Sequence, residues 1–101
     1  MIERHWKGIA KPEEADNYIR HLQTKTFPHL SSLAGFIKAS IGKRPVGNGV
    51  EFLIVTTWDS LESIKQFAGE NIAIANVPPE ARAMMLEFDP LVSHYEIIPL
   101  T

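Results

Sequence analysis

The chain has 101 residues, of which 45% are hydrophobic and 22% are charged, and its formal net charge is −2. These values predict a single globular domain over residues 1–101 and argue against a nucleic-acid or membrane-surface partner, since no basic run is present. The chain has no cysteine, which excludes disulfides, thiolate metal sites and cysteine nucleophiles. No apolar run approaches the ~20 residues of a membrane span and no signal peptide is evident, so we expect a cytoplasmic protein.

The N-terminal part of the chain predicts a strand followed by a helix. In the expected strand, residues 2–9, Arg4 and Trp6 share one face because side chains alternate. Pro12 suits the first turn of a helix, which we expect to end just before Pro28 because proline disfavours helical geometry in the residue that precedes it. The buried stripe of this helix consists of Ala15, Tyr18, Ile19, Leu22 and Thr26.

A β-hairpin is predicted in the middle of the chain. Residues 35–42 and 50–58 are the expected strands, and the Pro-, Gly- and Asn-containing residues 45–49 form the turn. The second of these strands is apolar on both faces, with Phe52, Ile54 and Trp58 on one and Leu53 and Val55 on the other. A strand of this kind lies in the middle of a sheet and is covered on both sides.

The C-terminal part predicts two helices and a last strand. Asp59 is a candidate N-cap for a helix that ends at Gly69 and buries Leu61, Ile64, Phe67 and Ala68. After an irregular stretch, a short helix is expected from Pro78 up to Asp89, with Ala81, Met84, Met85 and Phe88 on its buried side. Residues 92–98 are the last expected strand, with His94 and Glu96 on one face.

The resulting order is β-α-β-β-α-β with an extra short helix before the last strand, which is the ferredoxin-like arrangement of the α+β class. We expect the first and third strands to be central and parallel, with both long helices on one face. Leu53 and Val55 would then face water, at a cost of ~1.5–3 kcal/mol per side chain. Because most oligomers are symmetric dimers, we predict a homodimer formed through this sheet face.

Several short segments resemble one protein family. The matching segments are Arg4-x-Trp6-x-Gly8, Leu33-Ala34-Gly35-Phe36, Phe52-Leu53-x-x-Thr56-x-Trp58-Asp59-Ser60, Phe67-Ala68-Gly69, Phe88-Asp89-Pro90 and His94-Tyr95-Glu96. The chain resembles small proteins of the antibiotic biosynthesis monooxygenase type in the dimeric α/β-barrel superfamily. This resemblance implies the same dimeric fold, and its members include cofactor-free oxygenases of aromatic polyketides, haem-degrading enzymes and proteins without a demonstrated activity. The haem-degrading branch carries an Asn on the first strand and a His after the central helix, and this chain has neither.

The candidate site residues each have two interpretations. His94 is a general base or a donor to a phenolate, or else a structural histidine. Arg4 is the counter-ion of an anionic ligand, or else pairs with Glu96 across adjacent strands. Four aromatic residues either line a substrate pocket or fill the core, namely Trp6, Tyr18, Trp58 and Phe67. His21 and His29 are expected at the surface, and no metal or cofactor motif is present.

Three functions are compatible with these residues. The first is a cofactor-free monooxygenase or related oxidoreductase that deprotonates a small hydroxylated aromatic, stabilises the carbanion-like form and lets it react directly with oxygen. The second is a non-catalytic homodimeric small-molecule-binding or stress-response protein. The third is an isomerase or decarboxylase that uses the same pocket without oxygen. A roomy buried cavity would favour the first function over the second.

Overall fold

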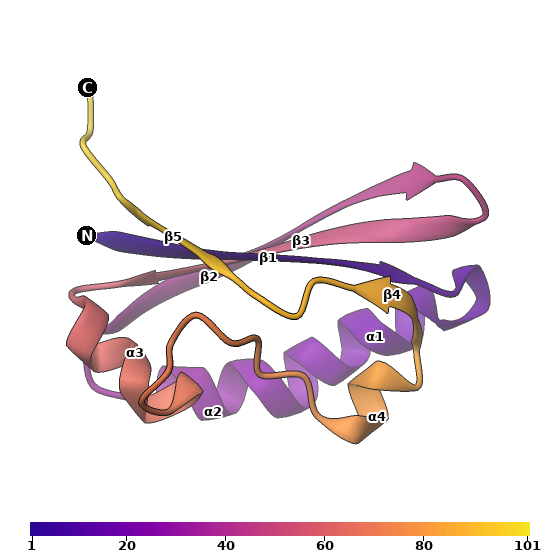
Figure 1. The fold of residues 1–101 in the computed structure, drawn as a ribbon, viewed down its shortest axis with the longest axis horizontal. Coiled ribbons are helices and arrows are strands. Elements are labelled where there is room, and N and C mark those ends of the chain that lie inside the picture. The colour runs from indigo at the N-terminus through magenta and orange to yellow at the C-terminus, as the bar shows by residue number, and fades with distance from the viewer.

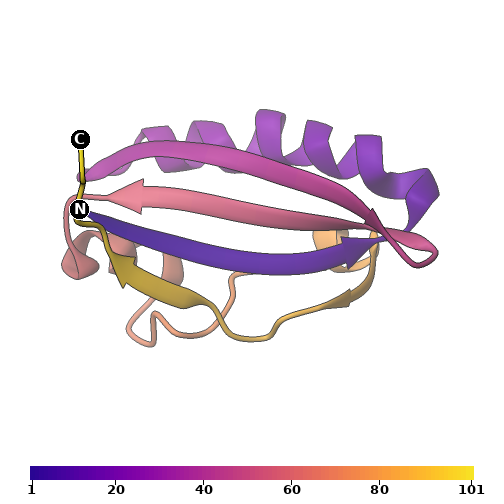
Figure 2. The same ribbon diagram turned by 90° about the horizontal axis from the view of Figure 1, so that it is seen from above.

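The computed structural model describes residues 1–101 as a five-stranded antiparallel sheet with every helix on one face (Figure 1). The strands are β1 (Ile2–Ala10), β2 (Phe36–Val46), β3 (Gly49–Trp58), β4 (Met85–Phe88) and β5 (Ser93–Glu96). Their order is β2-β3-β1-β4, and β5 also pairs with β1. Viewed from above, β4 and β5 follow each other along the edge of β1 that β3 leaves free (Figure 2). The predicted ferredoxin-like α+β fold is confirmed.

The direction of the central strands differs from the prediction. β1 and β3 are antiparallel, with Arg4 opposite Thr56 and Trp6 opposite Ile54. The helical crossover makes β2 run parallel to β1, and the tight hairpin at Gly47 and Asn48 then reverses the chain. A strand that follows a hairpin therefore runs against β1, so the expectation of parallel central strands was wrong.

The helical segment after β1 continues through Pro28, where the sequence predicted its end. It consists of a 3₁₀ turn η1 (Pro12–Glu14), α1 (Ala15–His21), a π-helical turn η2 (Leu22–Thr26) and α2 (Phe27–Ser31). Proline lacks an N–H and its ring crowds the carbonyl four residues earlier, so an ordinary helical turn is disfavoured there. The π turn is wider, and within it the N–H of Phe27 donates to the carbonyl of Leu22. The helix therefore accommodates Pro28 instead of ending.

Two further helices, α3 (Leu61–Ala68) and α4 (Pro79–Arg82), complete the layer. The N-cap of α3 is Ser60, whose hydroxyl accepts from the backbone N–H of Ser63 at 3.2 Å, whereas the sequence suggested Asp59. The predicted helix up to Asp89 was also wrong, because residues 85–88 form β4 instead. These residues pair with the free edge of β1, and sheet pairing outweighs local helical spacing.

The core lies between the sheet and the helices in two clusters. The first contains Ala10, Ala15, Tyr18, Leu22, Phe52, Ala81 and Met85, and the second contains Leu30, Trp58 and Ile64. We call the opposite side of the sheet, which carries Leu53 and Val55, the outer face. No element of the chain covers it, as Figure 1 shows above the sheet. None of the helices has both the length and the apolar character needed to span a membrane.

Candidate functional site

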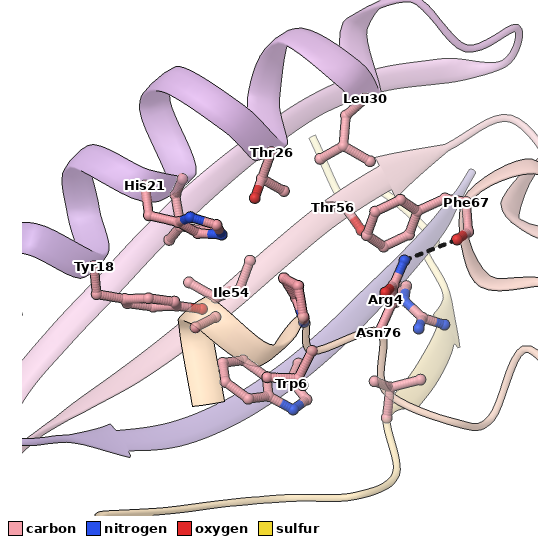
Figure 3. Close-up of a pocket in the computed structure, with 15 residues that line it drawn as sticks. Arg4, Trp6, Tyr18, His21, Thr26, Leu30, Ile54, Thr56, Phe67 and Asn76 are labelled. Carbon is pink, nitrogen blue, oxygen red and sulfur yellow. Dashed lines mark hydrogen bonds between the residues drawn. The ribbon is translucent and has the colours of Figure 1, made fainter. Parts of the chain in front are cut away.

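A cavity of about 70 Å³ lies between the two core clusters, under the helical segment (Figure 3). Its lining comes from β1, β3, the four α-helices, η2, the irregular residues before α4 and one residue just before β5. The lining residues are Arg4, Trp6, Tyr18, His21, Leu22, Thr26, Leu30, Ile54, Thr56, Phe67, Asn76, Val77, Pro78, Ala81 and Val92. In Figure 3, Tyr18, His21 and Thr26 project from the helix toward the sheet residues Arg4 and Trp6.

Arg4 is a buried cation without a carboxylate partner. Only 5% of its surface is exposed, and none of the ion pairs in the chain includes it. Its Nη1 donates to the carbonyl of Ile72 at 2.5 Å, and its Nη2 donates to the carbonyl of Ile74 at 3.1 Å. Burial lowers the pKa of Arg4 to about 10. The pair with Glu96, the alternative interpretation of Arg4, does not form, because the register places Glu96 opposite Ile2.

His94 contacts Arg4, as expected for residues that share a face of the sheet. The two residues are directly opposite each other on β5 and β1, and Arg4 Nη1 donates to His94 Nε2 at 3.0 Å. Because arginine has no acceptor, this nitrogen must carry a free lone pair, and the ring proton is on Nδ1. Burial and the positive charge of Arg4 both lower the pKa of His94. His94 is absent from the cavity lining and has its lone pair engaged, so its contact with Arg4 orients the guanidinium.

Three of the four predicted aromatic residues line the cavity, and the fourth does not. Trp6, Tyr18 and Phe67 are in the lining, and the guanidinium carbon of Arg4 lies 5.9 Å from the centroid of the Phe67 ring. Trp58 is fully buried in the second core cluster, where its Nε1 donates to Thr56 Oγ1 at 2.9 Å. Trp58 is thus a core residue.

Trp6 is held in place by the backbone around it. Its Nε1 donates to the carbonyl of Asp89 at 2.8 Å, in the segment that joins β4 to β5. Its ring lies over Gly8, where an added Cβ would stand only 2.5 Å from Trp6 Cη2. The absence of a side chain at Gly8 therefore lets the indole lie along β1 and form a wall of the cavity.

His21 is the site residue that the sequence interpretation missed. It was expected at the surface, but it is 8% exposed and lines the cavity. Its ring stacks on Tyr18 with centroids 6.3 Å apart, and its Nδ1 lies 3.8 Å from Glu80 Oε1. Burial raises the pKa of Tyr18 above its ordinary value, so this hydroxyl stays protonated. The spacing could have identified His21, because it follows Tyr18 by three residues and so lies on the same helix face.

An adjoining groove enlarges the space that a ligand can use. It has a volume of about 350 Å³, lies between β2 and the helical segment, and shares Leu22, Thr26, Leu30, Ile54 and Thr56 with the inner cavity. A cavity of about 150 Å³ holds benzene. The inner cavity alone is too small for an aromatic ring, but the groove and the cavity together are large enough.

The inner cavity can therefore accept one polar substituent of a ring that lies in the groove. The chemistry available to that substituent is the fixed positive charge of Arg4, the imidazole of His21 and neutral polar groups, which come from Tyr18, Thr26, Thr56 and Asn76. Nowhere in the chain do three His, Cys, Asp or Glu side chains come close enough together to hold a metal ion.

Comparison with known proteins supports the fold. No protein-family model matches the sequence, and a comparison with curated proteins found no match. A crystal structure of a protein from Bacillus cereus, described as a "Putative Antibiotic Biosynthesis Monooxygenase", is similar to this chain with a TM-score of 0.65 and 15% sequence identity. The match covers 99% of this chain and 93% of that chain. This chain has the ferredoxin-like fold of antibiotic biosynthesis monooxygenase-type proteins.

Proposed function

We propose that this protein is a cofactor-free monooxygenase that acts on a small hydroxylated aromatic compound. The observation that carries the proposal is Arg4, a buried cation with no carboxylate partner, on the wall of a cavity lined by Trp6, Tyr18 and Phe67. Burying a charge is costly unless an opposite charge or hydrogen bonds compensate. The name of the Bacillus cereus protein with this fold agrees with a monooxygenase.

Arg4 would stabilise the substrate after it loses a proton. Two backbone carbonyls and His94 already hold the guanidinium in position, so little reorganisation is needed when negative charge develops nearby. A cation in a partly dehydrated site attracts an anion more strongly than one in water. Stabilising the phenolate, with its carbanion-like ring carbon, prepares the substrate to react with oxygen.

The proposed reaction balances without an added reductant. The anion reacts with O₂ to form a carbon–oxygen bond and, after protonation, a ring hydroperoxide. Loss of water from the hydroperoxide breaks the O–O bond and leaves a quinone. One oxygen atom enters the product, the other leaves as water, and the substrate supplies both hydrogens and both pairs of electrons. For 1-naphthol and O₂, the products are naphthoquinone and water.

Oxygen uptake by 1-naphthol in the presence of the protein tests this proposal. We expect one O₂ consumed per naphthoquinone formed, with one atom of ¹⁸O from ¹⁸O₂ in the product by mass spectrometry. Arg4→Met should abolish uptake, and Arg20→Met, which removes the same charge from an exposed helix position, should not. A product that forms without oxygen uptake would instead indicate an isomerase or decarboxylase.

One observation favours a non-catalytic binding protein as the second candidate. The inner cavity has less than half the volume that holds benzene, so it leaves little room for oxygen beside the substituent that faces Arg4. Tight binding of 1-naphthol without oxygen consumption or product would support this alternative.

The proposed functional unit is a homodimer that packs the outer faces of two subunits together. The support is the uncovered face itself, on which Leu53 and Val55 are only half-buried by their own chain. A specific interface would bury more than about 1,000 Å².

A further inference from the structure

We propose that His21 is the base that takes the hydroxyl proton of the substrate, and that Glu80 on α4 stabilises the imidazolium that forms. This inference rests on the proposed function only in taking the ligand to be a hydroxylated aromatic. It does not require that the ligand reacts with oxygen.

His21 lines both the inner cavity and a second, outer pocket. This outer pocket has a volume of about 220 Å³, and Glu80, Lys25 and His29 also line it. The inner cavity and the outer pocket share His21, Thr26, Phe67, Asn76 and Pro78. His21 is therefore in contact with the inner cavity, which would take the ligand hydroxyl, and with the outer pocket, which Glu80 lines.

No other group in the lining can accept the proton. The lining contains no carboxylate, and His21 is its only histidine. Tyr18 is already protonated and Arg4 is a cation. His94 lies outside the lining and its Nε2 lone pair accepts from Arg4. Neither ring nitrogen of His21 makes a hydrogen bond within the chain, and neither is completely buried. One nitrogen therefore has a lone pair that a ligand can reach.

One carboxylate near His21, that of Glu80, favours proton transfer from the cavity. Glu80 Oε1 lies 3.8 Å from His21 Nδ1, slightly beyond hydrogen-bond distance, and its carboxylate is exposed. Lys25, which lines the outer pocket together with His29, and Arg4, which lines the inner cavity, are cations and oppose a positive charge on His21. In the transfer, the ligand O–H bond breaks and an N–H bond forms on His21. The phenolate then faces Arg4 while the imidazolium faces Glu80, so each new charge has an opposite charge nearby.

Anaerobic binding of 1-naphthol tests this assignment without any turnover. At about pH 7.5 a free phenol and a free imidazole are both largely neutral. We expect the naphtholate absorbance band to appear on binding. Calorimetry in buffers of different ionisation enthalpy should show no proton released, because the proton stays on the protein. In His21→Gln the naphtholate absorbance should fall at least about tenfold. If any naphtholate band remains in this variant, its formation should release a proton to the buffer.

His29→Gln is the matched control, since His29 is an exposed histidine of the outer pocket and lies outside the inner cavity. It should behave as the unmodified protein. Glu80→Gln, at an exposed position that should not affect folding, should weaken the band by up to about fivefold, as expected for a partly exposed ion pair.

Two results would overturn the assignment. One is an unmodified protein that shows no naphtholate band or that releases a proton on binding. The other is a His21→Gln variant with the same band and no proton release. A naphtholate band that depends on His21, without oxygen uptake in air, would reject the monooxygenase and leave the role of His21 intact.

Discussion

Replacing Arg4 with methionine tests the central feature of the site, a positive charge held ready for an anion. Methionine retains much of the apolar stem and removes the charge. Arg4 is 5% exposed and its guanidinium is fixed by the carbonyls of Ile72 and Ile74, so a ligand oxyanion would gain a preoriented, charge-assisted hydrogen bond. Such bonds contribute about 1.5–3 kcal/mol. The expected loss in affinity is therefore about 10- to 150-fold.

The assay compares two ligands of similar shape. Calorimetric titration with 1-naphthoate, an anion, should show the full loss in Arg4→Met. Titration with 1-naphthamide, which is neutral, should change by no more than about threefold, a difference below 1 kcal/mol. Arg20→Met should bind both ligands as the unmodified protein does, which controls for the change in net charge. Equal losses for the two ligands would show that Arg4 supports the shape of the cavity and not an anion.

The same substitution has a cost in stability. The carbonyls of Ile72 and Ile74 lose their hydrogen bonds to the guanidinium, and a hydrogen bond to a charged group contributes about 1.5–3 kcal/mol. The removal of a buried charge offsets part of this loss. We expect the melting temperature to fall by several degrees, with near-UV circular dichroism preserved, so that binding can still be measured at 25 °C.

Three other predictions concern the rest of the fold. Light scattering at micromolar concentration should give twice the 11.3 kDa mass of one chain. Leu53→Asp should reduce the measured mass to that of one chain or unfold the protein. If the variant keeps the mass and the melting temperature of the unmodified protein, the outer face is exposed to solvent and forms no interface. Because the pKa of His94 is lowered in the folded protein, the unfolded chain binds more protons than the folded one just below about pH 6.5. Lowering the pH through this range should therefore reduce the melting temperature, and should reduce it less in His94→Gln. Identical pH profiles of the melting temperature in the two proteins would contradict this. Gly8→Ala should displace the Trp6 indole and change its fluorescence, because the new Cβ would stand 2.5 Å from the ring; an unchanged spectrum and unchanged 1-naphthol affinity would count against the packing described.

The sequence predicted the sheet side of the site better than its helix side. Alternation along a strand depends only on backbone geometry, so Arg4 and Trp6 could be assigned to one face from the sequence alone. The contact of Arg4 with His94 on the last strand followed from the topology. The sequence could not show which aromatic side chains line a cavity and which fill the core. That outcome depends on how closely the neighbouring side chains pack around each ring. Trp58 and Trp6 share a face of the sheet, yet only Trp6 reaches the cavity.

The errors on the helix side have a common cause in long-range contacts. Residues 85–88 have helical spacing, but the unpaired edge of β1 draws them into a strand. From its own helix alone, His21 is expected to be polar and exposed. It is buried because α4 packs beside it, and α4 lies more than 50 residues further along the sequence. Local propensity describes each segment in isolation, whereas these positions are decided by a partner segment that the pattern does not identify.

The π turn at residues 22–26 also corrects the phase of the helix. A step of four residues overshoots one α-helical turn by about 40°, so a row of side chains spaced by four winds gradually around the axis. Tyr18, Leu22, Thr26 and Leu30 form such a row, and all four line the inner cavity. The π turn has more residues per turn, so it reduces the accumulated rotation between Leu22 and Thr26. Leu30 therefore still points to the second core cluster beside Trp58. Removing one residue from this turn would rotate α2 relative to α1, and the two ends of the helix could no longer face the same row of the sheet.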